Sequence, residues 1–286
     1  MKPFKIILIV FLFGSPLLLY AQPGAALSKG KLFIIGGGDR PPSLMNALVA
    51  ASSLKKGDYV VVLPMSGENP DTSYYYFKAD LEPVCKNPIL NFNFTREKVN
   101  DKSWLDSLIK AKLIFITGGD QDRFMNIVLN TPVCTAIHTA YRNGATIAGT
   151  SAGAAVMSQH MITGNQITDT IYKATFPKLV GNNIEIKPGL GLLTAAVIDQ
   201  HFIVRSRYNR LLSALAKFPA LSCIGIDEET AIIIRGNNVE VAGEGQVIVI
   251  QKPEQLKITD RGLIKLKDMQ FSIYTKGDRF KINAGK

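Results

Sequence analysis

From Lys31 onward, the chain alternates short, continuously apolar runs with longer stretches in which apolar residues recur every three or four positions. Runs that are apolar on both faces are typical of strands buried in a parallel sheet, and the longer stretches are typical of helices packed on it. The sequence therefore predicts an α/β fold, with a mainly parallel sheet and helices on both faces. The predicted strands up to residue 150 are the run beginning at Lys31, Tyr59–Leu63, Ile89–Phe94, the run beginning at Lys112, and Thr146–Ala148; the predicted helices are Ser43–Leu54, Pro70–Leu81, Trp104–Lys110, Arg123–Leu129 and Val133–Asn143.

The pattern becomes mixed after Leu190, where short strands follow one another around one amphipathic helix, Arg207–Lys217. Gly236-Asn237-Asn238 separates two apolar runs, which predicts an antiparallel hairpin of Ala231–Arg235 with Val239–Ala242. Because no linker separates this region from the first half, residues 22–286 are predicted to form one domain with antiparallel C-terminal strands. The other strands predicted here are Thr194–Asp199, Cys223–Ile226, Val247–Ile250 and two short strands around Lys276-Gly277-Asp278.

The first 21 residues have the organisation of a secretory signal peptide, with two lysines ahead of the apolar run Ile6–Leu19. This run is too short to span a bilayer comfortably, and we expect cleavage after Ala21. Leu19 is larger than is usual three residues before a cleavage site, so an uncleaved N-terminal anchor is the alternative. The expectation is a secreted or periplasmic chain without a stable membrane anchor.

Charge and cysteine usage argue against two classes of protein. The formal net charge of +10 falls to +8 without Lys2 and Lys5, but the basic residues are dispersed and form no basic block or stripe. Nucleic-acid binding is therefore not expected, and the charge indicates solubility with a weak preference for anionic ligands. The three cysteines, Cys85, Cys134 and Cys223, are far apart and odd in number, which does not fit a disulfide framework.

The run Ala145–Ala148 ends in Gly149-Thr150-Ser151-Ala152-Gly153, the pattern of a nucleophile elbow. Such an elbow holds a serine in a strained turn between a strand and a helix, here predicted as Ala152–Met157. The amide of Ala152 would then be free to bind an oxyanion at the positive end of the helix. The alternative interpretation is a glycine-rich turn in which Ser151 only caps a helix.

Two other glycine-rich loops follow predicted strands, Gly36–Asp39 and Gly118–Gln121. Because ligands bind beyond the carboxyl ends of parallel strands, we expect these loops and Ser151 to share one rim of the sheet. The three glycines of the first loop are followed neither by the spacing of a dinucleotide fingerprint nor by the lysine of a phosphate-binding loop, so nucleotide binding is not favoured.

A serine nucleophile needs a base and a group that orients the base, and the chain has three histidines. His160 would lie about 13 Å along the elbow helix, out of reach. His138 lies within a predicted helix and is expected to be a surface or packing residue. His201 follows an apolar strand and is the candidate base. The orienting acid is expected among Asp227, Glu228 and Glu229, and spacing alone does not choose between them.

The sequence carries four motifs in order: Gly118-Gly119-Asp120-Gln121, Gly149–Ala154, Asp199-Gln200-His201-Phe202 followed by Arg205, Arg207 and Arg210, and Gly225-Ile226-Asp227-Glu228. Together these motifs resemble those of the cyanophycinases, serine peptidases related to the aspartyl dipeptidases and, in fold, to class I glutamine amidotransferases. The resemblance runs from about Lys31 to Ile250 and implies Ser151 as nucleophile, His201 as general base and Glu228 as orienting acid. The order serine, histidine, acid differs from that of the α/β-hydrolases.

The same resemblance implies a substrate pocket lined by Gln121, Asp199, Gln200, Arg205, Arg207 and Arg210. Guanidinium groups can grip the free α-carboxylates of a polyaspartate chain that carries arginine on each side chain, and Asp199 can face a substrate guanidinium. On an ideal helix Arg205 and Arg207 would point about 200° apart. All three arginines can converge only if Arg205 lies before the helix begins.

The expected function is a secreted serine exopeptidase that hydrolyses cyanophycin to β-Asp-Arg dipeptides without a metal or cofactor. The amides of Ala152 and of Gly118 or Gly119 are expected to form the oxyanion hole. One alternative is a related peptidase acting on short aspartyl or isoaspartyl peptides. The other is a non-catalytic binding protein of the same fold, which predicts His201 and Glu228 too far from Ser151 to form a relay. The tail strands are compatible with a homodimer.

Overall fold

The computed structural model describes residues 28–168 and 178–282. The predicted signal peptide lies outside these residues. Among the helices that are described, none has the length and apolar character needed to cross a membrane.

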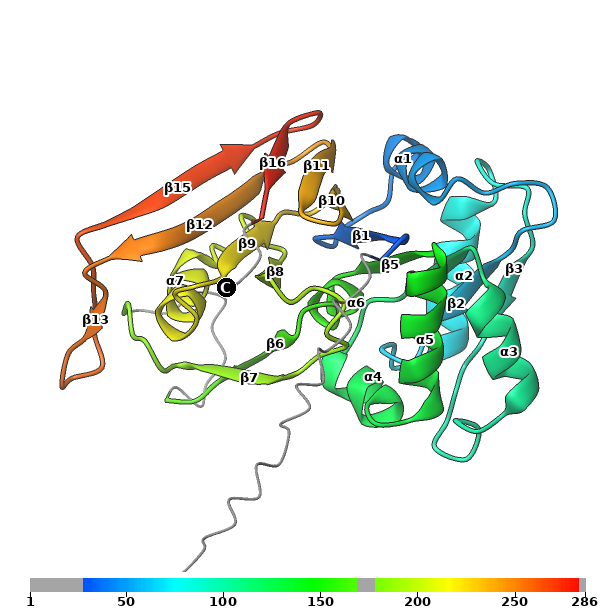
Figure 1. Cartoon of the computed structure of the whole chain (residues 1–286), viewed down its shortest axis with the longest axis horizontal. Helices are drawn as coiled ribbons and strands as arrows, with labels where there is room; N and C mark the ends of the chain where they lie inside the picture. The colour runs from blue at the N-terminus through cyan, green and yellow to red at the C-terminus, as the bar shows by residue number, and fades with distance from the viewer. Residues whose placement is uncertain (1–27, 169–177, 283–286) are drawn as a thin grey trace, which may run out of the picture.

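The core of the fold is an eight-stranded sheet with the order β16-β11-β10-β1-β5-β4-β2-β3 (Figure 1). The five strands from β1 to β3 in this order are parallel, as predicted, and β10, β11 and β16 extend the sheet in antiparallel fashion. The predicted hairpin is therefore confirmed. The strands are β1 (Lys31–Ile35), β2 (Val60–Leu63), β3 (Ile89–Asn91), β4 (Leu113–Ile116), β5 (Thr146–Thr150), β10 (Thr230–Arg235), β11 (Asn238–Gly243) and β16 (Arg279–Lys281).

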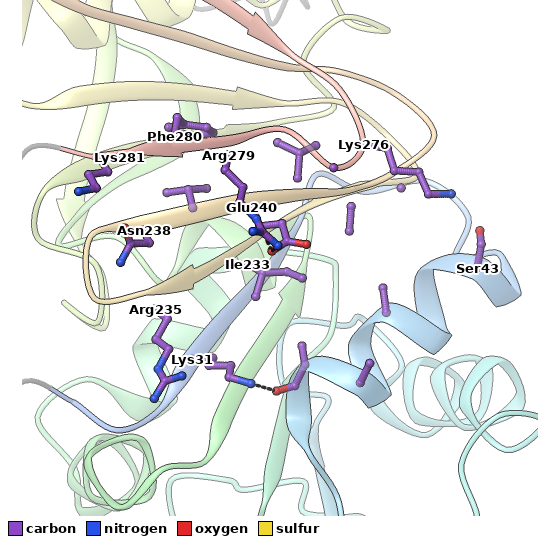
Figure 2. A pocket seen from close by; sticks show the side chains of 18 residues that line it. Lys31, Ser43, Ile233, Arg235, Asn238, Glu240, Lys276, Arg279, Phe280 and Lys281 are labelled. Carbon is purple, nitrogen blue, oxygen red and sulfur yellow. Dashed lines mark hydrogen bonds and ion pairs between the residues drawn. The ribbon is translucent and has the colours of Figure 1, made fainter.

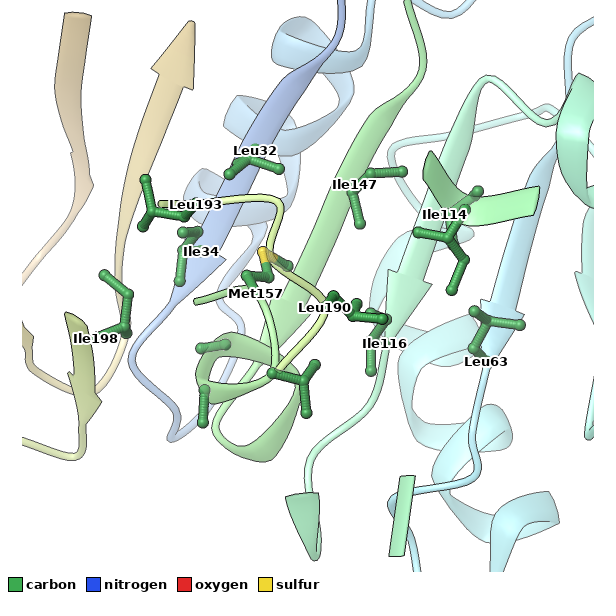
Figure 3. Close-up of a cluster of buried hydrophobic side chains, with 14 of the residues drawn as sticks. Leu32, Ile34, Leu63, Ile114, Ile116, Ile147, Met157, Leu190, Leu193 and Ile198 are labelled. Carbon is green, nitrogen blue, oxygen red and sulfur yellow. The ribbon is translucent and has the colours of Figure 1, made fainter. Parts of the chain in front are cut away.

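Helices cover both faces of this sheet because alternate strand residues point to opposite sides. Phe33 and Phe115 face α1 and α2, whereas Leu32, Ile114 and Ile147 belong to the larger cluster shown in Figure 3, which includes residues of α3, α4 and α5. This two-sided burial explains the continuous apolar runs of the sequence. The helices are α1 (Pro42–Ser52), α2 (Pro70–Leu81), α3 (Lys102–Lys110), α4 (Gln121–Val128) and α5 (Pro132–Asn143).

A second sheet, in the order β15-β12-β9-β8, packs against the first through the same large cluster, to which it contributes Ile198, Ile224 and Val249. Its other face packs on α7 (Tyr208–Lys217). The predicted strands Thr194–Asp199 and Cys223–Ile226 belong to this sheet and do not extend the first one. Its strands are β8 (Ala196–Gln200), β9 (Ser222–Ile226), β12 (Val247–Glu254) and β15 (Asp268–Tyr274).

The region after the elbow differs from the prediction. Helix α6 covers only Ala152–Ala155, and the predicted extension to Met157 is wrong. The backbone beyond it bonds to the segment 189–193, as in the hydrogen bond from the Leu190 amide to the Val156 carbonyl (2.7 Å). His160 accordingly lies on a strand and not on the elbow helix. The unpredicted strands are β6 (His160–Gln166) and β7 (Ile184–Pro188), which form a hairpin, and β13 (Lys257–Ile258) and β14 (Ile264–Lys265), which form another.

Candidate active site

Ser151 sits in a sharp turn between β5 and α6, as the elbow pattern predicted. Its φ of 54° and ψ of −111° lie outside the common regions for a non-glycine residue. Flanking glycines permit the close packing around it. A Cβ at Gly149 would lie 2.4 Å from the carbonyl oxygen of Gly153, and a Cβ at Gly153 would lie 2.2 Å from that of Ile116. Each contact is too short for any side chain, so the turn requires glycine at both positions.

His201 follows β8 and lies next to Ser151 although it comes from the second sheet. The Ser151 Oγ and the His201 Nε2 are 2.8 Å apart. The His201 amide donates to the carbonyl of Gly36 at 2.8 Å, which ties the histidine to the loop after β1. The imidazole packs directly on Gly37, where a Cβ would lie 2.2 Å from its Cε1 atom. The first glycine-rich loop thus contacts the histidine ring and fixes its position.

The three candidate acids after β9 have different surroundings. Glu228 Oε1 lies 2.5 Å from His201 Nδ1. Asp227 Oδ1 instead accepts hydrogen bonds from the amides of Ile203 and Val204, at 3.0 and 3.1 Å, and so holds the turn that follows the histidine. Glu229 is exposed and has a φ of +53°. Among these acids, Glu228 is the one positioned to orient the imidazole.

The electrostatics of the site favour a neutral imidazole. Burial lowers the pKa of His201 below its ordinary value of 6.5. The hydrogen bond from the ring to Glu228 raises this pKa, and the positive charges of Arg205 and Arg207 lower it again. With the Nδ1–H directed to Glu228, the Nε2 lone pair is available to accept the Ser151 proton.

Two backbone amides beside the serine are free to stabilise an oxyanion. Within residues 28–168 and 178–282, the amides of Gly118 and Ala152 donate to no protein acceptor. Gly118 is close to the nucleophile, since a Cβ built on it would lie 3.4 Å from the Ser151 Cβ. Gly119 packs on Ser66, where a Cβ would lie 2.2 Å from the carbonyl oxygen. The arrangement favours Gly118 and Ala152 as the oxyanion pair, a role that stays a prediction.

The residues expected to line a substrate pocket are placed differently from one another. Asp199 is fully buried. Its Oδ2 accepts a hydrogen bond from the Arg210 Nε at 2.8 Å, and its Oδ1 accepts one from the Arg210 Nη2. Arg207 is also buried, and its Nη1 donates to the carbonyl of Gln200 at 2.6 Å. Asp199 therefore faces a guanidinium of its own chain and not an open pocket. Substrate contacts by Asp199, Arg207 and Arg210 stay predictions. In the structure, Asp199 and Arg207 form hydrogen bonds with the backbone of Gln200, the residue before His201, and Arg210 pairs with Asp199.

Arg205 and the two glutamines complete the predicted set. Arg205 is exposed and lies in the turn before α7, which begins at Tyr208. The predicted condition that Arg205 lie before the helix begins is therefore met. Gln121 is buried at the start of α4, and its amide donates to the carbonyls of Ile162 (3.1 Å) and Thr163. The side-chain oxygen of Gln200 is buried and has no partner within the described chain. Arg205 is thus the arginine of the set best placed to contact a ligand.

The two other histidines have partners of their own. The His138 Nε2 lies 2.7 Å from the carbonyl oxygen of Leu190. The His160 ring stacks on Phe218, with 4.2 Å between the ring centroids. Both arrangements fit packing roles, which is the role predicted for His138.

Comparison with known proteins identifies the family of this chain. Residues 51–242 match the profile of Peptidase family S51. The chain is 35% identical over 266 residues to the cyanophycinase of Trichormus variabilis, covering 88% of this chain and 86% of that protein. It is 35% identical over 188 residues to the cyanophycinase of Geminocystis herdmanii, covering 63% of this chain and 66% of that protein.

A solved structure shares the fold. The crystal structure of a peptidase from an acI-B1 Actinobacterium superposes with a TM-score of 0.63 at 20% identity, and the match covers 88% of this chain and 96% of that one. This likeness supports the fold, and the family assignment depends on the sequence matches. The profile spans most of the chain and the matched cyanophycinases share about a third of its residues, so the chain belongs to peptidase family S51 and is a serine-type peptidase.

Proposed function

We propose that the protein is an exopeptidase that hydrolyses cyanophycin, multi-L-arginyl-poly-L-aspartate, to β-Asp-Arg dipeptides. The observation that carries this proposal is the continuous set of hydrogen bonds from Ser151 through His201 to Glu228, at 2.8 and 2.5 Å. Relatives named cyanophycinase, which match 88% of the chain, supply the substrate class.

In the proposed mechanism, the Ser151 Oγ attacks the carbonyl carbon of an aspartyl peptide bond while the His201 Nε2 accepts its proton. Glu228 holds the Nδ1–H and stabilises the imidazolium that forms. The amides of Gly118 and Ala152 bind the oxyanion of the tetrahedral intermediate. The imidazolium then protonates the leaving amine, and a water molecule releases the acyl group by the same steps in reverse.

The charge of the substrate fits the surroundings of the serine. Each repeating unit of cyanophycin carries a free α-carboxylate on its arginine, and Arg205 is an exposed guanidinium whose charge acts on His201. A bidentate contact between the two would place the neighbouring aspartyl carbonyl near Ser151. Short aspartyl or isoaspartyl peptides carry a carboxylate as well, so the choice between polymer and short peptide needs a direct test.

The test is incubation of the purified mature chain with insoluble cyanophycin granules, with soluble dipeptide measured by mass spectrometry. A parallel assay uses short isoaspartyl peptides at matched concentrations. Release of β-Asp-Arg from the granules supports the proposal. Hydrolysis of the short peptides alone would identify the related dipeptidase activity and refute the polymer assignment, and hydrolysis of neither would refute both.

We also propose that the protein is exported and that the mature chain begins at Gln22, as the lysines and apolar run of the N-terminus indicate. N-terminal sequencing of protein recovered from outside the cytoplasm is the measurement. A chain that keeps Met1 and sediments with membranes would instead establish the uncleaved anchor, and full-length chain in the cytoplasm would refute export.

The acid limb of the pH profile is expected below pH 6.5. Burial lowers the pKa of His201, so the imidazole keeps its neutral, proton-accepting form in more acidic solution than an ordinary histidine. Activity should therefore be lost as the pH falls through this lowered pKa. The measurement is kcat/KM against pH, which reports on the free enzyme. The Arg205→Gln variant removes a charge that lowers this pKa, and its limb should move to higher pH; an unchanged or opposite shift would contradict the assignment.

A further inference from the structure

A groove of about 920 Å³ lies between α1 and the antiparallel strands β10, β11 and β16 (Figure 2). Lys31 borders it at the amino end of β1, whereas Gly36, just beyond the carboxyl end of β1, contacts His201. A strand of this length separates the two places by roughly 15 Å. The Lys31 end of the groove is therefore separate from the candidate active site, whereas the opposite end reaches Gly243, which pairs with Thr230 just after Glu228 and Glu229. The volume of the groove falls within the usual range for small-ligand sites.

Positive charge is concentrated at one end of this groove. Arg235, Asn238 and Lys281 are cross-strand neighbours in the register of β10, β11 and β16, and Figure 2 shows Lys31 beside Arg235. Within residues 28–168 and 178–282, Lys31, Arg235 and Lys281 have no carboxylate partner. Burial lowers the pKa of the Lys31 ammonium, and the charges of Arg235 and Lys112 lower it further. An anion at this end would relieve the repulsion.

The rest of the groove is neutral overall and largely apolar. Arg279 pairs with Glu240 at 3.0 Å and Lys276 with Glu244 at 3.1 Å, so these cations are already balanced. Ile233 and the alanines of α1 at positions 47, 50 and 51 supply an apolar surface. The small side chains leave the hollow open. One charged end followed by an apolar channel matches a ligand with a single anionic head and an apolar body.

We propose that the groove binds a carboxylate-headed amphiphile of the fatty-acid type. Within this cluster of Lys31, Arg235 and Lys281, the head contacts Lys31 and Arg235, which lie side by side (Figure 2), and the alkyl chain lies over Ile233 and α1. An acidic peptide fits less well because the cations along the groove beyond this cluster already have carboxylate partners. A second copy of the chain is an alternative occupant that the test below distinguishes from the amphiphile.

The test is calorimetric titration of the full mature chain with submicellar decanoate. Acetate is the control that keeps the carboxylate head but lacks the alkyl chain. Decyltrimethylammonium is the control that keeps the alkyl chain but carries a positive head. We expect saturable one-to-one binding of decanoate and much weaker binding of the other two. Equal binding of acetate would show a simple anion site, and equal binding of the cationic amphiphile would show a non-specific apolar surface. Either outcome, or no saturable decanoate binding, would overturn the proposal.

Variants locate the site. Arg235→Gln should weaken decanoate binding about tenfold, the effect of losing one charge-assisted hydrogen bond. Lys265→Gln is the matched control, because it removes one positive charge from an exposed residue that does not line the groove. Equal affinity in the two variants would place any binding elsewhere. Thermal unfolding checks that both variants are folded. A dimer that persists at saturating decanoate and is lost in Arg235→Gln would identify a second copy as the occupant and overturn the proposal.

Discussion

Replacement of Ser151 by alanine is expected to lower kcat for peptide hydrolysis by about 10⁴-fold or more, because removing the nucleophile of a catalytic triad eliminates the covalent step. The change deletes one oxygen atom and leaves the backbone free to keep the strained turn (φ of 54°). We therefore expect the folded structure and the affinity for substrate to change little. Initial rates of dipeptide release under saturating substrate give the measurement.

Ser103→Ala is the control for this experiment, since it makes the same chemical change at an exposed position in α3. It should retain full activity. Labelling by a serine-directed phosphonate should disappear in the Ser151→Ala variant and persist in the control. An active Ser151→Ala enzyme would contradict the nucleophile assignment. Inactivity of the unmodified protein and of both variants would favour the non-catalytic binding protein.

Replacement of Gly37 by alanine is expected to lower kcat about 10²-fold, although Gly37 takes no part in bond making. Its Cβ would lie 2.2 Å from the His201 Cε1 atom, so the imidazole must leave the position in which it meets Ser151. A displacement of about 1 Å in a catalytic group can cost about 100-fold in rate. Initial rates over a range of substrate concentrations should show the loss mainly in kcat.

The control must separate this collision from backbone strain, because Gly37 has a φ of +122°. Gly57→Ala provides it: Gly57 has a φ of +93°, and a Cβ there would meet nothing within 4 Å. Both variants are expected to lose about 1–3 kcal/mol of stability from the unfavourable φ. Only Gly37→Ala should lose activity. Equal activity of the two variants would show that the position of the imidazole does not depend on its close contact with Gly37.

The site is assembled from both sheets. Ser151 follows a strand of the first sheet, and His201 and Glu228 follow strands of the second. The packing of the two sheets therefore sets the distance between nucleophile and base. The large shared cluster, to which Ile34, Ile116 and Ile198 belong, fixes that packing. Mutations there would be expected to alter activity through geometry, without any contact with substrate.

The sequence by itself determined the parallel core, the elbow at Ser151 and the choice of His201 among three histidines. These features depend on neighbours in the chain: apolar runs mark buried strands, and glycines mark turns that no side chain would allow. The hairpin β6–β7 was missed because its strands are only partly buried and lack a continuous apolar run.

Residue spacing did not decide which acid meets the histidine, although the family resemblance implied Glu228; the tertiary structure places Glu228 there and also decides which arginine stays accessible. Asp227, Glu228 and Glu229 are consecutive, and their directions depend on contacts from elsewhere, such as the bond from the Glu229 amide to the Gly37 carbonyl (2.9 Å). Arg205 and Arg210 look equivalent in sequence, but the buried carboxylate of Asp199 binds Arg210. A charge removed from water needs a partner, and the pairing is set by which strand and helix come together, information that no local pattern carries.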